Sequence, residues 1–162
     1  NEFLHRTHIQ SKDASLIHLG LMDSTQLVAC MTFGKPRFNK KYDYELIRYS
    51  SELGVNIIGG AGKLLAHFRK KNPGSIVSYA DRRWSTGNLY KTLGFVKEKT
   101  TKPGYRYYHS NKKELFNRLQ FQKHLLVGMP GYELKLTEYE IMRINGYDRL
   151  WDAGHTRWVL DK

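Results

Sequence analysis

The sequence predicts a mixed α/β (α+β) domain, and three observations carry this prediction. Several segments alternate apolar and polar residues with a period of two, whereas the segment after the glycine-rich turn at residues 59–62 repeats its apolar residues at helical spacing. The expected strands and helices interleave in the middle of the chain, which favours crossovers within one sheet. The chain has 162 residues, 40% of them hydrophobic and 26% charged, which is enough to bury a core.

The first third of the chain predicts a hairpin followed by a third strand. Residues 2–10 read as a short helix or an entry segment, and residues 35–42 as a basic loop. The turn at Asp23 joins the first two strands. The second strand ends at Gly34. The expected strands are residues 16–22, 27–33 and 44–50.

The middle of the chain alternates strands and helices. Asn72-Pro73-Gly74 ends the first helix, and Gly94 ends the second, for which Ser85 or Thr86 is the expected N-cap. The expected helices are residues 63–71 and 85–93, and the expected strands are residues 75–80, 95–100 and 105–109.

The last third predicts an appendage. Residues 111–126 read as a basic helix, and Thr137 with Glu140 forms a capping box for a helix that reaches Asn145. The tail predicts a hairpin from residues 147–151 and 157–160. We therefore expect a core at residues 1–110 and a C-terminal helical and β-hairpin appendage at residues 111–162, packed on the same domain.

The charge balance predicts a polyanionic partner. Lys and Arg total 27 against 15 Asp and Glu, so the net charge is +12. Basic clusters alternate with aromatic residues, and such side chains can hold phosphates and stack on bases, although the same clusters could simply solvate the surface. By charge alone the partner could be DNA, RNA or an anionic membrane face; no long basic amphipathic helix favours the membrane, and we expect DNA. The candidate nucleic-acid-binding residues are Arg37, Arg82, Arg83, Trp84, Arg106, Lys112 and Lys113.

Several classes are disfavoured. No apolar run approaches the roughly 20 residues of a membrane span, and the single Cys30 excludes intramolecular disulfides and cysteine-rich zinc sites. We expect no metal site and a cytoplasmic location. Paired acidic residues with nuclease spacing are missing, so we do not expect this chain itself to cleave phosphodiesters. It begins at Asn1 rather than methionine, which leaves room for an attached nuclease domain upstream.

The turn at residues 56–65 is a candidate phosphate-binding loop, because glycines and a following helix start expose backbone amides. The P-loop and dinucleotide patterns both fail here. Asn56-x-x-Gly59-x-Ala61 fits the acetyltransferase loop, with Asn where Gln or Arg is usual. A tight connection without a ligand is the alternative.

A second motif follows about 30 residues later. Asn88-Leu-Tyr90-x-x-Leu-Gly-Phe95, taken with the glycine loop, resembles the GNAT (Gcn5-related N-acetyltransferase) superfamily, from about Leu16 to His109. The resemblance implies a GNAT-like mixed, splayed central sheet and an acetyl-CoA or other acyl-CoA donor, with Tyr90 protonating the departing thiolate. It implies that the donor is held by Ile58, Gly59, Gly60, Ala61, Gly62, Lys63 and Asn88.

Longer strings resemble phage-encoded regions that lie next to Vsr-like homing-endonuclease domains. They are residues 31–37, 78–88 and 146–154. The chain is also similar in kind to Mom-type phage proteins, which are GNAT-related and modify adenine in DNA. The resemblance to the endonuclease-associated phage regions covers nearly the whole chain, and it implies a phage-infected bacterial cell as the setting.

Three side chains are catalytic candidates. Asp81 follows a predicted strand, where it could act as a base or pair with a neighbouring arginine. Glu45 could serve as a base, orient Arg48, or form a cross-strand ion pair. Tyr90 could act as the general acid or pack in the core. The sequence thus favours a transferase that modifies a DNA base or another amine; the alternative is a non-catalytic DNA-binding module associated with a homing endonuclease.

Overall fold

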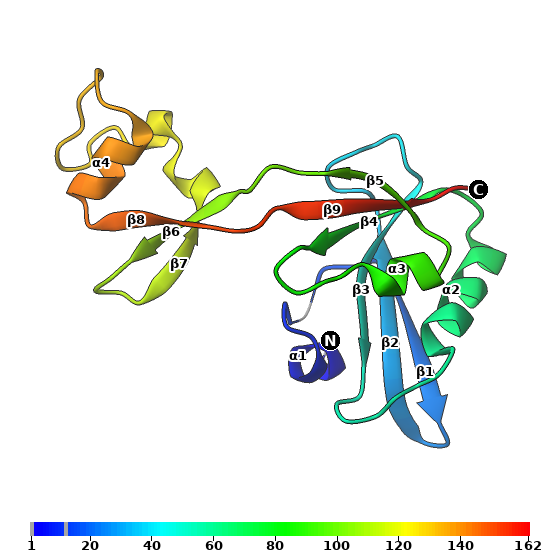
Figure 1. Ribbon diagram of the computed structural model, residues 1–162. Helices are drawn as coiled ribbons and strands as arrows, with labels where there is room; N and C mark the ends of the chain where they lie inside the picture. Colours follow the sequence, from blue (N-terminus) through cyan, green and yellow to red (C-terminus); the bar gives the residue numbers. More distant parts are fainter. Residues whose placement is uncertain (1, 12) are drawn as a thin grey trace. The chain divides into compact units, whose positions relative to one another are not determined.

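A computed structural model describes residues 2–11 and 13–162 (Figure 1). The chain divides into two compact units. The first contains the residues up to Thr101 together with His155–Lys162, and the second is Lys102–Gly154. This division differs from the expected boundary at residues 110 and 111, because the last strand of the chain belongs to the first unit.

The first unit is built on one mixed six-stranded sheet. All neighbouring strands are antiparallel except β3 and β4, which are parallel. The helices of this unit are α1 (Glu2–Thr7), α2 (Gly60–Lys71) and α3 (Asn88–Thr92). In sheet order, the strands are β1 (Ile17–Asp23), β2 (Gln26–Gly34), β3 (Tyr44–Ser51), β4 (Ile76–Asp81), β9 (His155–Leu160) and β5 (Val96–Thr100). The predicted α+β class is confirmed.

The sheet splays between its two parallel strands. β3 and β4 pair only through Tyr44 with Ile76 and Glu45 with Val77. Further along the chain the two strands diverge (Figure 1). A bulge in β3 accompanies the opening: Phe33 faces Leu46 and Thr32 faces Arg48, so Ile47 has no partner on β2. A splayed sheet is what the GNAT resemblance implied.

The larger apolar core of the first unit lies between this sheet and α2. The ring of Phe33 on β2 stacks on Phe68 of α2, with centroids 3.6 Å apart. Leu64 and Leu65 of α2 are buried in the same core, together with Trp158 of β9. The apolar residues predicted at helical spacing in residues 63–71 therefore form the stripe of α2 that faces the sheet.

The second unit is an insertion between β5 and β9, which are neighbours in the first sheet. Its sheet has the order β7 (Glu114–Asn117), β6 (Tyr105–His109) and β8 (Tyr147–Trp151). Helix α4 (Glu138–Ile144) supplies Ile141 and Met142 to a small core around Tyr107. The predicted capping box is confirmed: Thr137 Oγ1 accepts from the Glu140 amide, and the Glu140 carboxylate accepts from the Thr137 amide.

The helix predicted at residues 111–126 is wrong. Lys113 adopts a left-handed turn (φ 52°), after which β7 pairs with β6 and two short 3-10 turns follow, η1 (Arg118–Phe121) and η2 (Lys123–Leu125). Phe116 and Phe121 pack on the aromatic core of the second unit. These contacts between aromatic side chains outweigh the weak helical spacing of the segment.

Two other local predictions are corrected. The tail is not a hairpin, because β8 pairs with β6 in the second unit whereas β9 pairs with β4 and β5 in the first. The helix expected from residue 85 begins at Asn88, with Gly87 rather than Ser85 or Thr86 at its N-cap. Among the described residues, every helix is too short or too polar to cross a membrane.

Candidate active site

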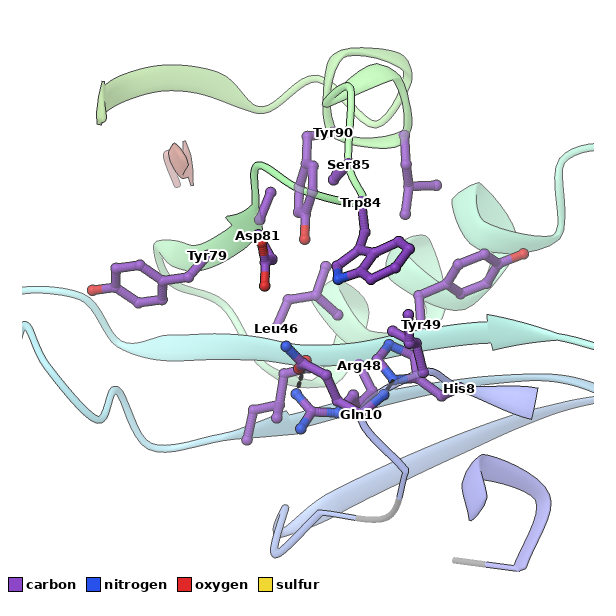
Figure 2. A pocket seen from close by; sticks show the side chains of 14 residues that line it. His8, Gln10, Leu46, Arg48, Tyr49, Tyr79, Asp81, Trp84, Ser85 and Tyr90 are labelled. Atoms are coloured by element: carbon purple, nitrogen blue, oxygen red, sulfur yellow. Dashed lines mark hydrogen bonds between the residues drawn. The ribbon is translucent and has the colours of Figure 1, made fainter. Parts of the chain in front are cut away.

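A cavity of about 180 Å³ opens where β3 and β4 separate. One wall comes from Leu46 to Tyr49 of β3 and from residues 8–10, which follow α1. The other comes from the end of β4, the loop after it and α3 (Figure 2). Of the predicted site residues, Asp81, Trp84 and Tyr90 line this cavity.

Tyr90 reaches the cavity from α3. Its ring stacks on Trp158 with centroids 5.4 Å apart, and its hydroxyl lies 3.1 Å from Ser78 Oγ. Ser78 Oγ is also 2.8 Å from the carbonyl oxygen of Leu46. Burial raises the pKa of the Tyr90 hydroxyl, so the phenol is protonated at neutral pH. Tyr90 can therefore donate a proton to a group in the cavity.

The placement of α3 depends on Gly87. This residue has φ 83°, and a Cβ atom there would overlap the indole ring of Trp158. Only glycine combines this left-handed backbone with contact between the backbone and the indole. The sequence Gly87-Asn88-Leu89-Tyr90 therefore fixes the position from which the tyrosine enters the cavity.

Asp81 lines the cavity, but its carboxylate is already bound. Both of its oxygens accept from Arg83, through the backbone amide (2.9 Å), Nε and Nη2 (2.6 Å). The hydrogen bond from the Arg83 side chain lowers the pKa of Asp81, so the carboxylate is ionised and paired. The geometry matches the alternative in which Asp81 pairs with its neighbouring arginine, and its proposed role as a base stays a prediction.

Glu45 lies away from the cavity. Its carboxylate is buried and accepts from the Arg37 backbone amide, Nε (2.9 Å) and Nη2 (2.5 Å). Arg37 also lies over the ring of Phe38. Glu45 therefore holds the loop before β3 against the strand, and Arg37, a predicted DNA contact, is engaged in this pair while half of its side chain is exposed.

The glycine turn forms the start of α2. Gly59 is left-handed (φ 73°), and the Gly60 amide donates to the Ile57 carbonyl oxygen. Among the described residues, the amides of Ala61 and Gly62 have no hydrogen-bond partner. The space beside Gly62 is open, and Ile58 next to the turn is 92% exposed. The start of α2 thus presents free amides of the kind that bind anions.

The structure does not place this turn and Tyr90 in one cavity. None of residues 58–63 lines the cavity that Tyr90 enters, and Asn88 is exposed outside it. The exposed side chain of Lys63 lies in the first turn of α2. The predicted donor-binding residues therefore form one surface at the start of α2, while Tyr90 belongs to the opening between β3 and β4.

The predicted DNA-binding residues fall on both units. Arg82, Arg83 and Trp84 follow β4, and Trp84 is 66% exposed where it lines the cavity. The second unit carries the rest: Arg106 on β6, and Lys112 and Lys113 in the turn before β7. The Lys112 ammonium lies over the rings of Phe116 and Tyr147.

Sequence reasoning missed His8 and Gln10 as cavity residues and gave Arg48 only a secondary role. The backbone amide of Gln10 donates to His8 Nδ1 at 3.1 Å. Burial, and after it the charge of Arg48, lowers the pKa of His8. His8 is therefore neutral at pH 7, with Nδ1 occupied. No local signal marks these residues, because the fold brings the segment after α1 beside β3.

No cluster of three or more His, Cys, Asp or Glu side chains able to hold a metal occurs in the described part of the chain.

The strand order, the single parallel pair and its divergence match the mixed, splayed sheet that the GNAT resemblance implied, with an insertion before the last strand. Among solved structures, the chain is similar to an acetyltransferase of Bacillus subtilis in complex with CoA. The TM-score is 0.47 and the sequence identity 15%, over 99% of this chain and 80% of that one. No protein-family model matches the sequence, and no match was found among curated proteins.

Proposed function

We propose that the protein is a GNAT-fold transferase that takes an acyl-CoA-like donor and transfers the acyl group to an amine. The observation that carries the proposal is the start of α2, where the amides of Ala61 and Gly62 have no hydrogen-bond partner among the described residues and the space beside Gly62 is open, at the positive end of a 12-residue helix. A diphosphate fits this chemistry, and the exposed Ile58 offers an adjacent apolar surface.

The donor supplies a diphosphate and a thioester; the chain supplies binding and a proton. The Ala61 and Gly62 amides hold the diphosphate. When the acceptor amine attacks the thioester carbonyl, a C–N bond forms and the C–S bond breaks. Tyr90 gives its hydroxyl proton to the departing sulfur, and the proton lost by the amine passes to solvent. The tyrosinate then regains a proton from water.

The acceptor that we propose is an amine of DNA, a base or another group, in a phage-type modification system within an infected bacterial cell. The net charge of +12 supports a polyanionic acceptor. The exposed Trp84 at the cavity supports contact with a base, since aromatic rings stack on unpaired bases.

A second function, a non-catalytic DNA-binding module for an attached nuclease, is favoured by one observation. Both carboxylates proposed as bases, Asp81 and Glu45, are bound by arginines. Such a module would bind DNA with a steep salt dependence and would produce no modified nucleoside.

Calorimetry with CoA tests the donor site through Gly62→Glu. The new side chain enters open space, and an acidic residue in the first turn of a helix is compatible with folding. Its carboxylate would repel the diphosphate, so we expect CoA binding to weaken by at least about tenfold with an unchanged melting temperature. Ala66→Glu, which adds the same charge one turn later, is the matched control and should retain affinity. Absence of saturable CoA binding by the unmodified protein would exclude this donor.

Mass spectrometry separates the two functions. DNA incubated with the protein and acetyl-CoA is digested to nucleosides, with Tyr90→Phe as the comparison. An added acyl mass that depends on Tyr90 supports the transferase. Tight, salt-dependent DNA binding without a modified nucleoside or CoA binding supports the module.

A further inference from the structure

Arg48 is the cationic side chain on the β3 wall of the cavity, opposite Tyr90 and Trp84 (Figure 2). One of its terminal amino groups donates to the carbonyl oxygen of Ile47 at 2.9 Å. Its Nε is buried and has no hydrogen-bond partner among the described residues. A buried N–H that lacks a partner is costly, and nearly all such groups in folded proteins are satisfied. Among the described residues, this nitrogen is therefore an unsatisfied donor on a side chain that lines the cavity.

The surrounding carboxylates do not neutralise the guanidinium. Asp13 accepts hydrogen bonds from Ser15 (2.9 Å to its amide) and from Thr32 Oγ1 (2.7 Å), so both of its oxygens are engaged. Glu45 and Asp81 are held by other arginines, as described above. No ion pair with Arg48 exists among residues 2–11 and 13–162.

The other charged and titratable neighbours leave the positive charge in place. His8 is neutral, Arg37 adds a second cation, and Tyr90 is protonated. Burial is the main cause that lowers the pKa of Arg48, and Asp13 only partly offsets it. Arginine stays protonated in proteins despite such a shift. Among the described residues, the cavity thus contains a cation that lacks an ion-pair partner and whose Nε–H has no acceptor.

We propose that this cavity binds an oxyanion of the acceptor substrate, a phosphate or a carboxylate, on the guanidinium of Arg48. The planar fork of arginine suits both groups through two parallel hydrogen bonds. The acceptor would thereby be held on the wall that faces Tyr90. As a statement about the acceptor, the proposal rests on the proposed function; the binding of an anion to Arg48 can be measured without it.

The test follows the side-chain Nε–H signals of arginine in ¹⁵N NMR spectra while inorganic phosphate is added to the full chain without CoA. The Arg48 signal is assigned from its loss in Arg48→Lys, which keeps the charge but removes Nε. We expect a saturable shift of this signal, and phosphate binding at least about tenfold weaker in Arg48→Met. Lys70→Met removes the same charge from the exposed end of α2 and should retain the affinity.

Two comparisons identify the source of the anion. Acetate against phosphate tests carboxylate against phosphate, and thymidine 5′-phosphate against thymidine tests a nucleotide as the carrier of the phosphate. Saturable binding in any of these arms that depends on Arg48 supports the proposal.

Other results overturn it. They are the absence of a saturable shift, an equal loss of affinity in Lys70→Met, or displacement of phosphate from Arg48 by CoA, which would place the donor there. If phosphate does not bind at Arg48, but CoA binds and Gly62→Glu weakens that binding, the proposed function still stands. If phosphate binds at Arg48 but CoA does not bind, only the proposed function is removed. If Arg48→Met does not fold, as judged by circular dichroism, Arg48→Lys takes its place in the titration.

Discussion

The hydroxyl oxygen of Tyr90 lies 3.1 Å from Oγ of Ser78, at the place where β3 and β4 separate. Ser78 has one hydroxyl hydrogen but two acceptors within reach, Tyr90 and the carbonyl oxygen of Leu46. When that hydrogen turns to Leu46, Ser78 can accept from Tyr90; when it turns to Tyr90, the phenol can donate into the cavity. The pair therefore allows the tyrosine to give up its proton without losing a hydrogen-bond partner.

Tyr90→Phe tests this role. We expect kcat for acyl transfer to fall by about 10²-fold, within the range typical of general acids, while CoA affinity and fold are retained. Because burial raises the pKa of Tyr90, the alkaline limb of kcat should lie above the ordinary tyrosine value and disappear in the variant. Tyr108→Phe, an exposed tyrosine of the second unit, is the control. An unchanged kcat would contradict the assignment.

Glu45→Gln separates a structural carboxylate from a catalytic one. The buried Glu45 loses its charge while Arg37, half of whose side chain is exposed, keeps its own. We expect a loss of about 2 kcal/mol in the free energy of unfolding, below the cost for a fully buried pair because water screens Arg37. Urea denaturation measures it, with the exposed Glu114→Gln as control. A fall in kcat of the folded variant by orders of magnitude would instead make Glu45 catalytic.

Gly87→Ala and Gly59→Ala form a matched pair. Both glycines are left-handed, with φ 83° and 73°, so both substitutions carry backbone strain of about 1 kcal/mol. At Gly59 the added methyl group meets open space, whereas at Gly87 it overlaps Trp158. We expect Gly87→Ala to cost more than about 3 kcal/mol in total and Gly59→Ala about 1 kcal/mol in thermal unfolding. Equal losses would contradict the prediction, because the overlap with the indole would then add nothing to the cost of the substitution at Gly87.

We predict that the free energy of unfolding falls at acidic pH because Glu98 becomes protonated. Burial raises its pKa, but hydrogen bonds from Lys41, Tyr42 and Arg157 outweigh burial and lower the pKa from 4.5 to about 2. Because the pKa is lower in the folded state, the stabilisation is present above about pH 4.5 and is lost as the pH falls through about 2. The free energy of unfolding, measured at several pH values in this window, should fall less steeply in Glu98→Gln. Identical slopes would refute the prediction.

The sequence by itself determined features that depend on residues a few positions apart. The β1–β2 hairpin followed from two apolar segments and a turn at Asp23, and the apolar stripe of α2 followed from its spacing. The cap at Thr137 followed from Glu140 three residues later. Each of these signals connects segments that are neighbours along the chain, where local geometry decides the hydrogen bonds.

Only the tertiary structure decided which distant segments meet. It assigned β9 to the first sheet rather than to a hairpin with β8, and it turned residues 114–117 into a strand because β6 offered a partner. It bound Glu45 and Asp81 to arginines, and it left Arg48 in a cavity where its Nε has no hydrogen-bond partner among the described residues. The physical reason is that pairing and burial depend on the neighbours that the folded chain supplies, and the spacing of residues along a sequence does not specify them.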